Sequence, residues 1–225
     1  MSKKNPQAYP CQIYLITPSK IDDLGAFVVL LEQVLAAAQV GCLQLRLKDT
    51  PRTRIVEVAT ALHPITQAHD TALIINDDPS IAAETGADGV HLGQADLRKV
   101  DIKSAQQMLK PGAIIGVTCH NSKDLAFKAG SGGAHYIAFG SFFESTTKPD
   151  APPANLELLT WWHETMEIPS VAIGGIMVEN AEAVIAAGAD FIALSSGVWN
   201  YQKGPVQAVK LLSDLCARFT RPQQI

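Results

Sequence analysis

The sequence lacks the patterns that mark secreted, zinc-binding and membrane-spanning proteins. Its four cysteines are scattered without a Cys-x-x-Cys pair, so we expect reduced thiols and neither a disulfide framework nor a zinc site. No apolar segment follows the first lysines, so no signal peptide is expected. The longest apolar run, Ala26 to Val40, is interrupted by Glu32, Gln33 and Gln39, and its helical stripe is amphipathic. We therefore expect a cytoplasmic protein.

Other absences narrow the classes of function. The formal net charge of −4 disfavours a general nucleic-acid or membrane-surface binder. No Gly-x-Gly-x-x-Gly follows the first expected strand, which weakens a dinucleotide-binding interpretation. No Ser-His-Asp spacing or activated cysteine stands out, so covalent catalysis is not favoured. What remains is 225 residues with 47% apolar side chains, typical of a globular enzyme with a sizeable core.

Apolar strands alternate with amphipathic helices along the whole chain. Eight such alternations with short connections favour parallel pairing and a compact (β/α)8 TIM barrel, with a doubly wound open sheet as the alternative. We expect one domain over residues 1–225, with residues 1–11 as a flexible extension. The expected strands cover 12–17, 43–48, 73–75, 89–92, 114–118, 136–139, 170–173 and 191–194. The expected helices cover 23–39, 51–68, 79–86, 102–109, 122–129, 156–166, 179–187 and 206–219.

The second expected strand carries an unusual polar face. Strict alternation puts Gln44, Arg46 and Lys48 on one side and leucines on the other. If both faces are covered, two cations and an amide converge on an enclosed space, and buried cations need partners. A phosphate or diphosphate fits, whereas an edge strand with a solvated face is the alternative.

Polar residues also follow the other strands, where a TIM barrel has its active site. Asp77 and Asp96 come from neighbouring strand ends, and two carboxylates beside a diphosphate are a typical Mg²⁺ arrangement. The Gly174-Gly175 turn and Ser195-Ser196 follow strands seven and eight, the recurring phosphate site of this fold. Each signal alone is also explained by turns and helix caps, as with Asn76-Asp77 before a proline. Their concentration at one rim favours a site.

The loop after the sixth strand, 140–153, is long and polar. Lys148 lies in it, and with Arg46 and Lys48 it would surround a diphosphate and stabilise charge as that group leaves. We expect the loop to act as a lid that excludes water, although a permanently ordered proline-rich loop is the alternative.

Taken together, these strand-end motifs resemble the thiamine phosphate synthase family along nearly the whole chain. The matching segments are Gln44-x-Arg46-x-Lys48, Ile74-Ile75-Asn76-Asp77, Gly86-Ala87-Asp88-Gly89-Val90-His91-Leu92-Gly93-Gln94-x-Asp96, Thr146-Thr147-Lys148, Ile173-Gly174-Gly175-Ile176 and Gly188-Ala189-Asp190. The resemblance implies that 4-amino-2-methyl-5-hydroxymethylpyrimidine diphosphate is condensed with 4-methyl-5-(2-phosphoethyl)thiazole. It implies a dissociative route in which diphosphate leaves with Mg²⁺ help.

The resemblance also implies roles for individual residues. Asp77 and Asp96 would hold Mg²⁺, and Thr118 would join the cations in catalysis. The residues expected at the diphosphate are Gln44, Arg46, Lys48, Asn76 and Lys148. Those expected around the thiazole phosphate are Ser145, Thr147, Gly175, Ser195 and Ser196. The expected partners are these small molecules, and a homo-oligomer is not excluded.

Several positions depart from the family's usual residues. Asp78 stands for a frequent arginine, Thr118 for serine, Leu47 for glutamate, Ser145 for threonine and Asn155 for glycine. Three other interpretations therefore stay open. They are a thiazole tautomerase of the same fold, a non-catalytic barrel that binds thiazole or thiamine phosphates, and a phosphate-sugar isomerase that would not need the Asp77–Asp96 pair.

Overall fold

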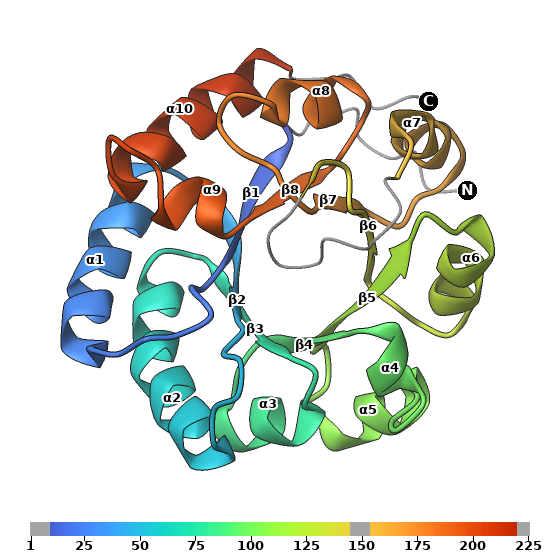
Figure 1. The fold of residues 1–225 in the computed structure, drawn as a ribbon. Helices are drawn as coiled ribbons and strands as arrows, with labels where there is room; N and C mark the ends of the chain where they lie inside the picture. Colours follow the sequence, from blue (N-terminus) through green and yellow to red (C-terminus); the bar gives the residue numbers. More distant parts are fainter. Residues whose placement is uncertain (1–9, 145–153, 220–225) are drawn as a thin grey trace.

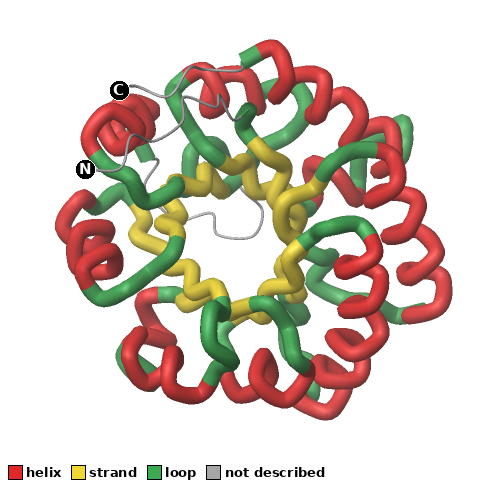
Figure 2. Tube along the Cα trace, turned by 180° about the vertical axis from the view of Figure 1, so that it is seen from behind, coloured by secondary structure: helices red, strands yellow, loops and turns green. Residues whose placement is uncertain are grey.

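A computed structural model describes residues 10–144 and 154–219. Eight parallel strands close into a barrel in the order β1 to β8, and each strand pairs with its sequence neighbours. Helices surround the barrel on all sides, as the outer ring of Figure 1 and the view from behind in Figure 2 show. The predicted TIM barrel is therefore confirmed, and the open-sheet alternative is wrong.

The strand bounds lie close to those expected from the sequence. The strands are β1 (Gln12–Ile16), β2 (Val40–Leu45), β3 (Ala72–Asn76), β4 (Gly89–Leu92), β5 (Ile114–His120), β6 (Tyr136–Phe139), β7 (Ser170–Ile173) and β8 (Phe191–Leu194). One prediction was wrong in its bounds, because β2 ends at Leu45 and leaves Arg46 to Lys48 in the following loop. The leucine alternation continues beyond the last strand residue, so it placed the expected strand too far along the chain and missed its start at Val40.

The helices follow the expected alternation, with two additions. They are α1 (Leu24–Ala37), α2 (Arg52–Ala68), α3 (Pro79–Thr85), α4 (Gln94–Leu97), α5 (Ile102–Met108), α6 (Lys123–Ser131), α7 (Leu156–Thr165), α8 (Ala181–Ala186), α9 (Ser196–Trp199) and α10 (Pro205–Arg218). The short helices α4 and α9 were not predicted, because a single turn carries no periodic apolar stripe. Both follow strand ends at the mouth of the barrel.

Local sequence signals explain where several helices begin. Asp23 caps α1, and its side chain accepts a hydrogen bond of 2.9 Å from the backbone N–H of Ala26. Pro79 occupies the first turn of α3, where a missing N–H costs little, and Gly86 ends that helix in the left-handed conformation. These signals fix the start of α1 and both ends of α3.

The protein has two apolar cores separated by the barrel wall. The larger lies between the strands and the helices and includes Leu43, Leu45 and Trp162. The smaller fills the barrel itself and includes Tyr14, Ile74 and Tyr136. Burial of both strand faces explains why most strands read as continuous apolar runs. Gln44 is an exception, because it lies in the wall beside Ile74 and is only 3% exposed.

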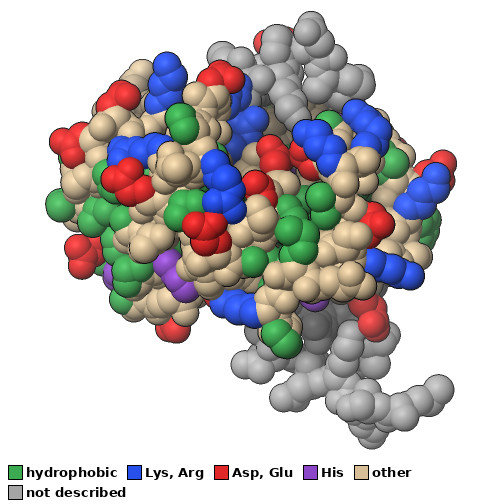
Figure 3. Space-filling model, turned by 90° about the horizontal axis from the view of Figure 1, so that it is seen from below, with side chains coloured by type: hydrophobic (Ala, Val, Ile, Leu, Met, Phe, Trp, Pro, Cys, Tyr) green, Lys and Arg blue, Asp and Glu red, His purple; other side chains and the backbone are tan. Residues whose placement is uncertain are grey.

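The described surface carries both signs of charge. Lysine and arginine side chains are interspersed with aspartate and glutamate over the face seen in Figure 3. Among residues 10–144 and 154–219, no helix is long and apolar enough to cross a bilayer. Of the flexible extension predicted over 1–11, Pro10 is exposed and Cys11 is buried, and the rest lies outside the described residues.

Candidate functional site

The carboxyl ends of the parallel strands gather most of the predicted site residues at one mouth of the barrel. Those in the described part of the chain are Gln44, Arg46, Lys48, Asn76, Asp77, Asp96, Thr118, Gly175, Ser195 and Ser196. Ser145, Thr147 and Lys148, and with them the predicted lid, lie outside the described residues.

The structure brings the two predicted metal carboxylates together. Asp77 follows β3 and Asp96 lies in α4 after β4, and their side chains are in hydrogen-bond contact. Partial burial, followed by the charge and the hydrogen bond of Asp96, raises the pKa of Asp77 from 3.8 to about 6. Arg46 and a hydrogen bond from Asn76 act in the opposite direction. Two carboxylates this close need a shared proton or a cation between them.

The turn at Asp77 has an unusual backbone conformation and is fixed by backbone hydrogen bonds. Asp77 has a φ of 68°, in the left-handed region that aspartate and asparagine tolerate better than most residues. Its N–H donates to the carbonyl of His91 on β4 at 2.8 Å, and the N–H of Asp78 donates to the carbonyl of Asn76 at 2.9 Å. The turn therefore ties the end of β3 to the neighbouring strand.

Asp96 is positioned by the short helix α4. Its N–H donates to the carbonyl of Gly93, and a side chain at Gly93 would crowd the Asp96 carboxylate. Lys99, one turn later, lies 3.6 Å from Asp96 Oδ1. In the same helix, Gln94 Nε2 donates to the backbone carbonyl of Thr118 at 2.5 Å. This bond links the loop that carries Asp96 to the end of β5.

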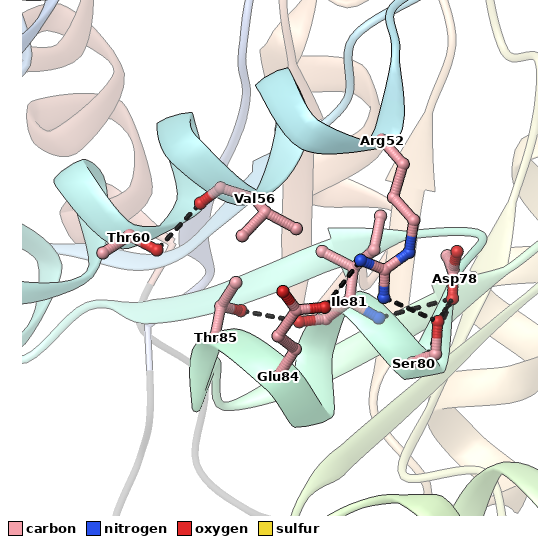
Figure 4. Close-up of polar contacts among 8 residues, drawn as sticks. All are labelled: Arg52, Val56, Thr60, Asp78, Ser80, Ile81, Glu84 and Thr85. Atoms are coloured by element: carbon pink, nitrogen blue, oxygen red, sulfur yellow. Dashed lines mark hydrogen bonds and ion pairs between the residues drawn. The ribbon is translucent and has the colours of Figure 1, made fainter.

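Asp78, the departure that changes local charge most, faces the start of α3. Its Oδ1 accepts from the Ser80 N–H at 2.8 Å, from the Ser80 hydroxyl at 2.6 Å and from the Ile81 N–H at 3.3 Å. Arg52 then bridges Ser80 Oγ at 3.2 Å and Glu84 at 2.6 Å, as Figure 4 shows. The additional carboxylate is thus used as a helix cap.

The two cations of the Gln44 stretch lie in different environments. Arg46 is half-buried, and its backbone N–H donates to Thr17 Oγ1 at 3.0 Å. Lys48 is exposed, and its N–H donates to the carbonyl of Ser19 at 3.0 Å. The loop after β2 is therefore held to the loop after β1. Arg46 is close enough to act electrostatically on Asp77, so the mouth has a cation beside its carboxylate pair.

A small cavity of about 210 Å³ adjoins the carboxylate pair. It is lined by Leu45, Leu47, Thr50, Arg52, Ile55, Asn76, Asp77, Asp78 and Ile81. Leu47 thus packs against the larger core, on the helix side of the barrel. A larger cavity of about 330 Å³ lies between α5 and α6 and contains Gln94 but none of the predicted site residues.

Glycines let the loops after β6, β7 and β8 pack tightly. Gly174 and Gly175 have φ values of 100° and 66°. A side chain at Gly175 would collide with the backbone of Phe143 and Glu144, and one at Gly197 would collide with the backbone of Ile176. The described parts of the three loops therefore pack closely against one another.

The two serines after β8 have different roles. Ser195 Oγ donates to the carbonyl of Thr17 at 3.1 Å, which ties the end of β8 to the end of β1. Ser196 begins α9 and is exposed. Of the two hydroxyls predicted to hold a phosphate, the one on Ser195 already has a backbone partner.

Three polar residues inside the barrel were missed as site residues. Tyr14 and Tyr136 belong to the inner core, and His91 is 5% exposed with Nε2 at 2.7 Å from Thr118 Oγ1. Their signal was a tyrosine or histidine ring within a largely apolar strand. That pattern is also typical of ordinary packing, so the sequence did not single them out.

Comparisons with known proteins identify the family of the chain. A family model described as thiamine monophosphate synthase matches residues 13–198. The thiamine-phosphate synthase of Rhodospirillum centenum is 49% identical over 88% of this chain and 94% of its own. That of Hyphomonas neptunium is 47% identical over 91% and 93%. A solved thiamine phosphate pyrophosphorylase from Pyrococcus furiosus has a TM-score of 0.80 at 30% identity and covers 93% and 97%. The chain belongs to the thiamine-phosphate synthase family of transferases.

Proposed function

We propose that the chain joins the pyrimidine diphosphate and the thiazole phosphate to give thiamine phosphate and free diphosphate. The bond between the pyrimidine methylene carbon and the diphosphate oxygen breaks, and its electron pair leaves with the diphosphate. The thiazole nitrogen then supplies the pair for the new carbon–nitrogen bond. The observation that carries this proposal is the contact between the Asp77 and Asp96 carboxyls beside Arg46, at the mouth of a barrel of this family.

The donor set fits Mg²⁺. Mg²⁺ prefers one or two carboxylates together with phosphate oxygens. Burial and the charge of Asp96, which raise the pKa of Asp77, support a cation beside the pair. Among the described residues, no group of three or more histidine, cysteine or acidic side chains competes as a metal site. Bound there, Mg²⁺ would neutralise charge on the diphosphate as it departs.

The side chains around the carboxylate pair would bind and orient the two substrates. Arg46 and Lys48 follow β2, and with Lys148 they would attract the diphosphate and stabilise its growing charge. Gln44 and Asn76 would orient the pyrimidine diphosphate, and Thr118 would offer a hydroxyl. The packed loops around Gly175, with Ser196 at the start of α9, would receive the thiazole phosphate, along with Ser145 and Thr147.

Two departures that supported a non-catalytic barrel are compatible with activity. Asp78 Oδ1 accepts three hydrogen bonds at the start of α3, and the Thr118 hydroxyl keeps a hydrogen-bond partner in His91. The tautomerase, which shares the fold, is not favoured by the comparisons, because the relatives from Rhodospirillum centenum and Hyphomonas neptunium are both thiamine-phosphate synthases.

The direct experiment is a coupled assay for thiamine phosphate with both substrates, first in chelator and then with Mg²⁺ restored. We expect product only with Mg²⁺. Asp96→Asn should lower turnover by about 100-fold or more, as loss of a charged transition-state contact does. Glu84→Gln, an exposed acid in α3, is the matched control and should keep full turnover. Product formation in chelator, or an active Asp96→Asn variant, would contradict the metal assignment.

A second variant tests the cations. Lys148→Ala should lower the rate of turnover more than it weakens binding of the pyrimidine diphosphate, because the charge matters most as the leaving group departs. Lys110→Ala removes a lysine whose ammonium pairs with Asp88, outside the predicted site, and serves as control. An equal loss in binding and in rate would assign Lys148 to ground-state binding.

A further inference from the structure

A chain of hydrogen bonds crosses the interior of the barrel and ends at Thr118. Gln44 Nε2 lies 2.9 Å from Tyr14 Oη, which lies 2.8 Å from Tyr136 Oη. Tyr136 Oη lies 2.8 Å from His91 Nδ1, and His91 Nε2 lies 2.7 Å from Thr118 Oγ1. The five side chains come from β2, β1, β6, β4 and β5, so the chain spans the barrel from one wall to the other.

The chemistry of the five groups sets the direction of this chain. Gln44 donates an amide hydrogen to Tyr14, and Tyr136 Oη is the acceptor within reach of the Tyr14 hydroxyl, so we assign the single hydrogen of Tyr14 to the bond with Tyr136. The single hydrogen of Tyr136 is in turn donated to His91 Nδ1. A neutral imidazole that accepts at Nδ1 carries its hydrogen on Nε2. His91 therefore donates to Thr118 Oγ1, and the hydroxyl hydrogen of Thr118 is left to point elsewhere.

The surroundings keep the chain intact. Gln44, Tyr14, Tyr136 and His91 are between 2% and 6% exposed, so a broken link would leave a buried polar group without a partner. The Tyr136 ring stacks on His91 with an interplanar angle of 22°. It also lies against Gly116, where even one methyl group would overlap the ring. Glycine at 116 thus makes room for the tyrosine that holds the imidazole.

From this geometry we infer that Tyr136 and His91 are positioning residues that make the Thr118 hydroxyl a hydrogen-bond donor toward the mouth. The identity of the acceptor rests on the proposed function: it is the diphosphate oxygen on which negative charge grows. A hydroxyl whose oxygen already accepts from His91 is a more acidic and better-directed donor. Thr118 touches the substrate, whereas Tyr136 acts through His91.

The first test needs no substrate. The ring ¹⁵N chemical shifts of His91 in the metal-free protein report which nitrogen carries the hydrogen. We expect the Nε2–H tautomer in the wild type and in Tyr14→Phe, because Tyr136 can still donate to Nδ1 there. Tyr136→Phe removes that donor and should release the tautomer preference. Ile74→Val removes one methyl group from the same inner core and should change nothing. An Nδ1–H tautomer in the wild type would mean that the chain runs the other way and would overturn the inference.

The second test separates positioning from folding. Tyr136→Phe should lower kcat by about tenfold with little change in KM, the pattern of a lost transition-state contact. In a Thr118→Ala background the same substitution should have no further effect, because the hydroxyl it orients is gone. Independent, multiplicative losses would assign Tyr136 a purely structural role. Because the tautomer is read without substrates, failure of the proposed reaction would leave that first result standing.

Discussion

The titration of Asp77 offers the most direct measure of the carboxylate pair. Its pKa of about 6 lies well above the ordinary 3.8, so the metal-free protein binds a proton there that the unfolded chain does not hold. The free energy of unfolding therefore falls as the pH rises from 3.8 through about 6, since the folded state binds more protons than the unfolded chain over that range. A cation that needs the ionised form should compete with this proton.

The size of the effect follows from the same value. With a pKa of about 6, roughly a tenth of Asp77 is protonated at pH 7 and roughly nine tenths at pH 5. Metal affinity at this ligand should thus fall about tenfold between those pH values, whereas an ordinary aspartate would give almost no change. Asp96→Asn should lower the midpoint by about one unit. It should not restore 3.8, because partial burial is the largest cause of the shift.

The assay is a carboxyl ¹³C NMR titration of the metal-free protein. The wild type, Asp96→Asn and the control Glu84→Gln are compared, and the wild type is repeated with excess Mg²⁺. We expect a midpoint near 6 in the wild type and the control, and lower midpoints in Asp96→Asn and with Mg²⁺. A midpoint that Asp96→Asn leaves in place would refute the pairing of the two carboxyls, and one that Mg²⁺ leaves in place would refute the shared cation.

Three further substitutions test other parts of the structure. Asp78→Ala should cost about 1 kcal/mol in urea denaturation because it removes the cap of α3, while Asp78→Asn should cost little. Gly116→Ala should cost about 1–3 kcal/mol by thermal denaturation, because the added methyl group overlaps Tyr136. Ser196→Asp should weaken thiazole phosphate binding in calorimetry far more than pyrimidine diphosphate binding, and equal losses would place that phosphate elsewhere.

The barrel could be predicted because each of its determinants is local. Apolar runs such as Leu73-Ile74-Ile75, ended by polar residues and followed by a helix start at Pro79, specify a buried parallel strand and its crossover. Where the alternation of apolar and polar residues was ambiguous, the prediction of a strand end was wrong, as at the end of β2. Leu47 continues the alternation of β2, yet hydrogen bonds from this loop to Thr17 and Ser19 replace the sheet pairing.

The carboxylate pair could also be predicted, since adjacent parallel strands bring their ends together. The fate of Asp78 could not, because it depends on the orientation of one side chain. The sequence shows only that a second carboxylate follows Asp77. The structure shows that this Asp78 carboxylate accepts hydrogen bonds from the N–H groups of Ser80 and Ile81 at the start of α3. The pairing of Ser195 with Thr17 is of the same kind, because its partner lies at the opposite end of the chain.

The division between the mouth and the interior follows from the cost of burying charge. Ionised groups such as Asp77, Arg46 and Lys48 lie where solvent or a counter-ion can reach them. Inside the barrel, burial raises the pKa of both Tyr14 and Tyr136, which keeps these two side chains neutral and their hydroxyl hydrogens in place. A chain of neutral hydrogen bonds can orient a donor without placing a charge in the barrel. A carboxylate in place of Tyr136 would instead have to take up a proton before it could donate a hydrogen bond to His91.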